Sequence, residues 1–117
     1  MSIERKQVGA RMSGAVVHGN TIYLAGQVAK AAAGKSVKEQ TTEILSIIDG
    51  LLAECGSSKL NLLSVNIWLS DMSTFAEMNA VWDGWVAPGH TPARATVEAK
   101  LAAPQFTVEI MVVAAKG

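Results

Sequence analysis

The residues best suited to chemistry lie near the C-terminus, on two stretches with strand-like alternation. Arg94, Thr96 and Glu98 alternate with alanine and valine, which is the pattern of a strand with one apolar face. Glu109 lies in a second apolar stretch, residues 106–114. A guanidinium binds a carboxylate through two parallel hydrogen bonds and stays charged when partly desolvated. Arg94 therefore suits the binding of a substrate carboxylate.

A structural ion pair is the competing interpretation of Arg94. If the last two strands form a hairpin whose paired residue numbers sum to an odd value, one face carries Arg94, Thr96, Glu98, Thr107 and Glu109. Desolvation would raise the pKa of Glu109, and a nearby arginine would lower it. Glu109 could thus hold or deprotonate a water, or simply balance the charge of Arg94. The residues alone leave both interpretations open.

Three further residues could line a site on the same elements. Thr96 offers a hydroxyl, although threonine is also a common strand residue. Asn79 falls on an expected helix over residues 74–86 and could bind a loop or a ligand. Gly26 could let a ligand approach the backbone and accept its N–H.

Metal, nucleotide and serine-triad chemistry find no support in the sequence. His18 and His90 are isolated from other metal-ligating residues, so we predict no metal. The glycine at position 26 stands alone, without a phosphate-binding glycine pattern. No serine has the accompanying histidine and aspartate pattern of a triad. Cys55 falls on the apolar stripe of a helix and is expected to be a core residue.

Composition sets the class of protein. The chain has 117 residues, which suits one domain over residues 1–117, and a formal net charge of zero, which argues against nucleic-acid or membrane-surface binding. Charged residues make up only 17% of the chain and hydrophobic residues 50%, so we expect self-association to cover part of the surface. A single cysteine and the lack of a secretory or membrane-spanning pattern predict a cytoplasmic protein.

The first half of the chain predicts two strands and a long helix. Strands over 15–18 and 21–29 are joined by Gly19-Asn20, a hairpin signal. Ser36 and Glu39 form a capping box at the start of an amphipathic helix that ends at Gly56. Gly50 lies inside this helix, where close approach to the sheet would explain it.

The second half supplies a strand over 62–70, the helix over 74–86 with Ser73 as a candidate cap, and the two C-terminal strands. The order ββαβαββ predicts an α+β two-layer domain, with a mixed sheet covered by two helices on one face. Met111 and Val113 make the other face partly apolar, so we expect a second subunit to cover it.

These residues together resemble the RidA/YjgF family of reactive-intermediate deaminases. The resemblance covers nearly the whole chain, through GNTIYLAGQV (19–28), DMSTFAEMNAVWDGWV (71–86) and HTPARATVEAKLAAPQFTVEIMVVA (90–114). The chain is most similar to the YoaB-like branch, through ARMS (10–13), MNAVWDGWVAPGH (78–90) and the VEIMVVAA ending.

The resemblance implies a chorismate-mutase-like fold and a homotrimer whose sheets pack as a barrel, with three ligand pockets between subunits. It also implies hydrolysis of enamines and imines such as 2-aminoacrylate and 2-iminopropanoate to 2-oxo acids and ammonia, without metal or organic cofactor. By position, Arg94 matches the arginine that binds the substrate carboxylate, and Glu109 matches the glutamate associated with the water. Gly26 and Asn79 match pocket residues, and Thr96 stands where well-studied deaminases have a cysteine.

Two positions depart from the family pattern. Met12 replaces a pocket tyrosine and Ala25 a pocket serine, so two hydroxyl groups are lost, while Arg11 and Ser13 add polar groups nearby. An imine deaminase is therefore the first prediction. A non-catalytic or regulatory protein that binds a small carboxylate in the same pocket is the alternative. A ribonuclease, a label some family members carry, is disfavoured by the neutral charge and the lack of a histidine pair.

Overall fold

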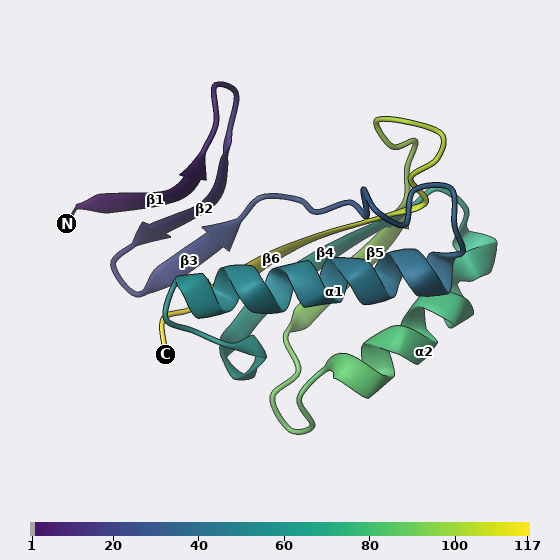
Figure 1. Ribbon diagram of the computed structural model, residues 1–117. Coiled ribbons are helices and arrows are strands. Elements are labelled where there is room, and N and C mark those ends of the chain that lie inside the picture. The colour runs from purple at the N-terminus through teal and green to yellow at the C-terminus, as the bar shows by residue number, and fades with distance from the viewer. Residues whose placement is uncertain (1) are drawn as a thin grey trace.

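A six-stranded mixed sheet and two α-helices make up the computed structural model, which describes residues 2–117 (Figure 1). The strands are β1 (Ile3–Val8), β2 (Ser13–His18), β3 (Thr21–Leu24), β4 (Leu62–Leu69), β5 (Ala93–Glu98) and β6 (Val108–Ala115). The helices are α1 (Val37–Glu54) and α2 (Phe75–Trp85), with short 3₁₀ turns η1 (Lys59–Asn61) and η2 (Met72–Thr74). The predicted α+β class with a mixed sheet is confirmed.

Strand order in the sheet is β1-β2-β3-β6-β4-β5. All neighbours are antiparallel except β4 and β5, which run parallel and are connected through α2. Parallel neighbours need such a crossover connection, and α2 provides it. Because β4 lies between β5 and β6, the hypothesis that the last two strands form a hairpin is wrong.

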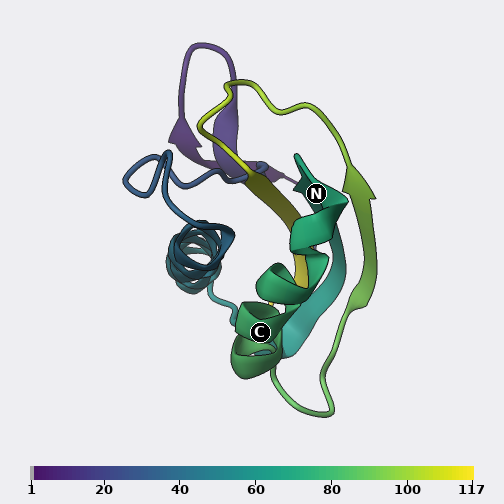
Figure 2. The same ribbon diagram turned by 90° about the vertical axis from the view of Figure 1, so that its right-hand side faces the viewer.

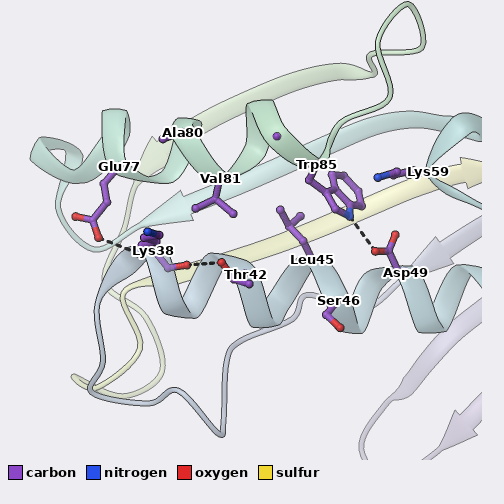
Figure 3. Close-up of a pocket in the computed structure, with 11 residues that line it drawn as sticks. Lys38, Thr42, Leu45, Ser46, Asp49, Lys59, Glu77, Ala80, Val81 and Trp85 are labelled. Atoms are coloured by element: carbon purple, nitrogen blue, oxygen red, sulfur yellow. Dashed lines mark hydrogen bonds between the residues drawn. The ribbon is translucent and has the colours of Figure 1, made fainter.

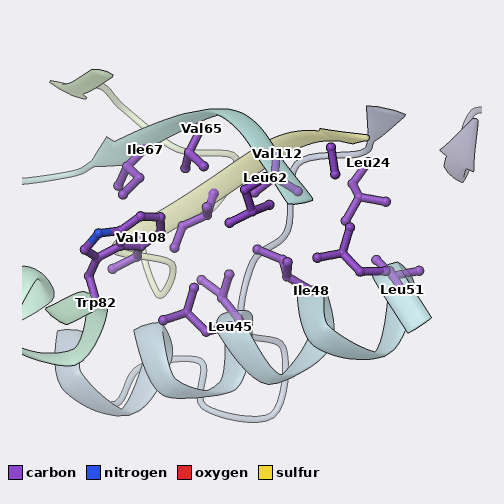
Figure 4. Packing of buried hydrophobic residues seen from close by; sticks show 14 of the residues in the cluster. Leu24, Leu45, Ile48, Leu51, Leu62, Val65, Ile67, Trp82, Val108 and Val112 are labelled. Atoms are coloured by element: carbon purple, nitrogen blue, oxygen red, sulfur yellow. The ribbon is translucent and has the colours of Figure 1, made fainter. Parts of the chain in front are cut away.

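Both helices lie on the same side of the sheet (Figure 2). The core fills the space between these layers, where apolar side chains of α1, α2 and alternate strand positions interdigitate (Figure 4). Ile48 of α1, Ile67 of β4 and Ile110 of β6 are almost completely buried there. The alternation read from the sequence thus places one face of each central strand against the helices.

The ends of α1 follow the predicted capping signals. Ser36 Oγ accepts a hydrogen bond of 3.1 Å from the Glu39 backbone N–H. At the other end Gly56 has a φ of 75°, and Ser57 N–H donates to the Leu52 carbonyl at 2.8 Å, as in a Schellman motif. Gly50, however, is exposed, and a Cβ there would meet nothing within 4 Å. The expected close approach of Gly50 to the sheet is therefore wrong.

Three local details differ from the sequence-based expectations. The edge strand β1 was not predicted, so the order begins with three strands rather than two. Strand β3 ends at Leu24, and Gln27 forms only an isolated bridge with Ile110. Ser73 does not cap α2; its backbone N–H instead donates to the Asp71 carboxylate at 2.9 Å, which caps the preceding 3₁₀ turn.

The sheet face opposite the helices carries several apolar side chains without cover from this chain. Tyr23 on β3 and Val97 on β5 are 48% and 50% exposed, and Met111 and Val113 lie on the same face. A separate observation is that no helix within residues 2–117 has both the length and the apolar character to cross a membrane.

Candidate functional site

Arg94 lies on the edge strand β5 and points toward α2. It pairs with Val65, which is buried against the helices, so the Arg94 side chain emerges on the helix side of the sheet. Its guanidinium carbon lies 5.2 Å from the ring centroid of Trp82 and 5.9 Å from that of Phe75, both on α2. These are cation–π distances, so two aromatic rings hold the cation in place.

Within residues 2–117 no carboxylate lies within ion-pair distance of the Arg94 guanidinium. The one ion pair found there joins Lys6 and Glu4, so the interpretation of Arg94 as a structural ion pair is wrong. Burial lowers the pKa of Arg94 below its usual value, while the negative charge of Asp83 opposes that shift. An arginine nonetheless stays protonated in proteins. The result is a half-buried cation whose hydrogen-bond donors are free to receive an anion.

Thr96 and Asn79 flank this cation. Thr96 follows two residues along β5 on the same face, and its Oγ1 is buried without a hydrogen-bond partner in the described chain. Asn79 is half-buried and stands four residues after Phe75 and three before Trp82, on the same stripe of α2. We call Phe75, Asn79, Trp82, Arg94 and Thr96 the β5 half-site.

Glu109 lies on the opposite face of the sheet. Trp68 of β4 pairs with Glu109, whereas Val65 pairs with Arg94, and these two β4 positions have opposite orientations. The prediction that Arg94 and Glu109 share a face is therefore wrong. The physical reason is the strand order, because β4 lies between the strands that carry the two residues.

Gly26 and Glu109 are in close contact on the open face. A Cβ at position 26 would overlap Glu109 Oε2 and lie 3.2 Å from its Cδ, so the carboxylate rests against the Gly26 backbone. Two hydrogen bonds between the backbones of Gln27 and Ile110, at 2.9 and 3.1 Å, fix the two segments side by side. No hydrogen-bond acceptor for the Gly26 N–H occurs among the described residues, so this donor can face a ligand.

Ala25 completes this second group. The Ala25 N–H donates to the Gly14 carbonyl at 2.9 Å, which holds Ala25 and Gly26 against the start of β2. Met12 lies in the connection between β1 and β2 and is 58% exposed, and among the described residues no hydrogen bond joins it to this group. We call Ala25, Gly26 and Glu109 the β6 half-site.

Neither a metal-ligand cluster nor an exposed thiol is found within residues 2–117. Among residues 2–117, no three histidine, cysteine or acidic side chains converge as metal ligands would. Cys55 is buried at the end of α1, as predicted, and burial raises the pKa of its thiol. The chemically distinctive groups are therefore those of the two half-sites.

Comparison with known proteins places the chain in a family. Residues 3–116 match the family described as Endoribonuclease L-PSP. A RutC family protein from Haemophilus influenzae is 46% identical over 114 residues, covering 97% of this chain and 98% of that protein. RutC family protein YoaB from Escherichia coli K12 is 44% identical over 115 residues, covering 98% of this chain and 99% of YoaB.

A solved structure supports the same family. The crystal structure of a YjgF family member from Neisseria meningitidis superimposes with a TM-score of 0.97 at 47% identity, covering 100% of this chain and 97% of that one. The chain belongs to the RidA/YjgF family and is YoaB-like.

Phe75 and Trp82 are the site residues that the sequence did not reveal. Their spacing indicated only the apolar stripe of a helix. Their contact with Arg94 depends on the parallel pairing of β4 and β5, which brings the edge strand beneath α2. The spacing of two aromatic residues along a helix does not by itself indicate that they contact an arginine.

Proposed function

We propose that the protein hydrolyses small 2-imino acids to 2-oxo acids and ammonia at a site built from both half-sites. The observation that carries this proposal is the half-buried Arg94 cation, which has no ion-pair partner in the described chain and stands beside the unpaired hydroxyl of Thr96. A buried charge is costly unless it is paired, so this arrangement favours an anionic ligand. A carboxylate matches the planar fork of the guanidinium.

The chemistry divides between the half-sites. The substrate enamine tautomerises to an imine whose carboxylate binds Arg94, which fixes the orientation of the reacting carbon. Glu109 holds a water that adds to the imine carbon, and its carboxylate takes up the proton released by that water. Glu109 returns that proton to the imine nitrogen, which completes the carbinolamine. The hydroxyl proton then passes through Glu109 to the nitrogen as the C–N bond breaks, so ammonia leaves and the 2-oxo acid remains. In this proposal the free N–H of Gly26, next to Glu109, binds the substrate beside this water.

Two copies of the chain supply the site in this proposal. Arg94 and Glu109 lie on opposite faces of one sheet, so neither half-site is complete by itself. The exposed Tyr23 and Val97 on the open face support burial of that face by another copy. We propose a homotrimer with pockets between subunits. A monomer mass by light scattering at micromolar concentration would contradict it.

The test of activity uses 2-aminoacrylate generated in situ by a dehydratase, with the 2-oxo acid followed over time. We expect Arg94→Ala to lose about 100-fold or more in kcat/KM, because the lost contact is charge-assisted and orients the substrate. Arg5→Ala is the matched control, since Arg5 is an exposed arginine on the edge strand β1. If Arg94→Ala hydrolyses the imine as fast as the parent protein, the role given to Arg94 is wrong.

A non-catalytic carboxylate-binding protein is the second candidate, and it is favoured by Met12 and Ala25. Neither side chain has a hydroxyl to offer a substrate or water; Ala25 directly precedes Gly26, and Met12 lies in the connection between β1 and β2. Calorimetry with 2-oxobutanoate beside the activity assay separates the two candidates. Saturable binding that depends on Arg94, without turnover of several imines, would establish the second.

A further inference from the structure

A groove between α1 and α2 lies apart from both half-sites. Its volume is about 650 Å³, within the range of small-molecule sites. Leu45 of α1 and Val81 and Trp85 of α2 form its apolar lining (Figure 3). Gly84 of α2 also lines the groove. The groove thus has room for an organic molecule and an apolar surface on which to hold it.

Gly84 keeps one part of this groove open. It lies within α2, where glycine is the least favourable residue apart from proline. A Cβ at this position would meet nothing within 4 Å, so no packing constraint in the chain requires glycine there. Because Gly84 lines the groove, we expect a large side chain at position 84 to take up part of its space.

Trp85 forms a fixed aromatic wall. Its indole Nε1–H donates to Asp49 Oδ2 at 3.0 Å, and its ring centroid lies 5.4 Å from that of Trp82 (Figure 3). Lys59 Nζ lies 5.3 Å from the Trp85 ring centroid. The wall is therefore held before any ligand arrives, which reduces the entropy lost on binding.

Two lysines and two carboxylates line the groove: Lys38, Lys59, Asp49 and Glu77. The carboxylate of Asp49 accepts from Trp85, and that of Glu77 accepts from the Lys38 backbone N–H at 2.8 Å. In the described part of the chain, neither Lys38 nor Lys59 has a carboxylate within ion-pair distance. The ammonium group of Lys59, next to the Trp85 ring, is therefore free to donate to an anionic ligand.

We propose that this groove binds a small amphipathic monocarboxylate. Its aromatic or short aliphatic body lies against Leu45, Val81 and Trp85, and its carboxylate pairs with Lys59 next to the aromatic wall. This site is independent of the proposed deaminase activity, because no member of either half-site except Trp82 touches its wall.

Titration of the full chain with 4-phenylbutyrate, followed by ¹H–¹⁵N NMR, tests the proposal. We expect saturable shifts of the Trp85 indole signal with a Kd of about 1 mM or tighter, and weaker binding of the uncharged 4-phenylbutanol. The backbone amide of Gly19, in the turn between β2 and β3, is the internal control, because Gly19 lines neither the groove nor either half-site. Absence of saturation at the Trp85 indole, or an equal shift of the Gly19 amide, would overturn the proposal.

Three variants locate the ligand. Gly84→Leu is expected to abolish the Trp85 shifts by filling the groove, whereas Gly84→Ala, its matched control, keeps most of the space and the binding. Lys59→Gln is expected to raise the Kd for 4-phenylbutyrate about two- to fivefold, as for loss of an exposed ion pair. The Kd for 4-phenylbutanol should stay unchanged. Because Lys59 lies outside the buried core, Lys59→Gln keeps the test decisive if Gly84→Leu fails to fold. Unchanged 4-phenylbutyrate binding in Lys59→Gln would contradict the pairing.

Discussion

Replacing Gly26 with alanine should displace the Glu109 carboxylate while leaving the fold intact. The backbone of Gly26 lies outside the left-handed region, so alanine is allowed there. The new Cβ would overlap Glu109 Oε2 and lie 3.2 Å from its Cδ, which requires the carboxylate to retreat by about 1 Å. Misplacing a catalytic group by that distance costs about 100-fold in rate. We therefore expect kcat/KM for imine hydrolysis to fall by about 100-fold.

The assay compares Gly26→Ala, Glu109→Gln and the double variant on 2-aminoacrylate generated in situ. If alanine at position 26 acts through Glu109, the double variant should be no slower than Glu109→Gln alone. Gly50→Ala is the matched control, because it adds the same methyl group to an exposed helix position. Full activity of Gly26→Ala, with the carboxylate shown to have moved, would refute the role of Glu109 in holding the water.

Three predictions concern the fold. Gly50→Ala should raise the free energy of unfolding by about 0.5–1 kcal/mol, because it adds helix propensity without a clash; an unchanged or lower melting temperature would contradict this. Gln40→Leu should lower the free energy of unfolding in urea by about 2 kcal/mol, because the buried Gln40 Oε1 accepts from the Thr107 N–H at 3.0 Å; no loss would show that this bond is replaceable. Cys55, whose thiol pKa is raised by burial, should react with a disulfide reagent at pH 8 only when the protein unfolds; fast reaction of the native protein would argue against its burial.

The helix α1 could be predicted because its signals are local. Ser36 and Glu39 mark its start within one turn, and Gly56 marks its end, whatever the rest of the chain does. The strand β1 gives no comparable signal, since IERKQV places polar side chains on both faces. Such a pattern suits an edge strand whose outer side meets solvent, and alternation cannot separate it from a loop.

Several residues of the site could be predicted from the sequence, but their relative placement could not. The family resemblance nominated Arg94, Glu109 and Gly26, and the contact of Gly26 with Glu109 gives that pair a physical basis. The relative placement of Arg94 and Glu109 depends on which strands are neighbours, a non-local property. Insertion of β4 between β5 and β6 reverses the face predicted from a hairpin. The aromatic contacts of Arg94 follow from the same strand order.

A crystal structure of the protein with 2-oxobutanoate is the most direct test of the proposed site. We expect the carboxylate of the bound acid to lie about 2.9 Å from two guanidinium nitrogens of Arg94. We also expect its keto carbon to face Glu109 and Gly26 of a neighbouring copy. A carboxylate bound elsewhere, with the Arg94 guanidinium still held only by Phe75 and Trp82, would contradict the proposed role of Arg94.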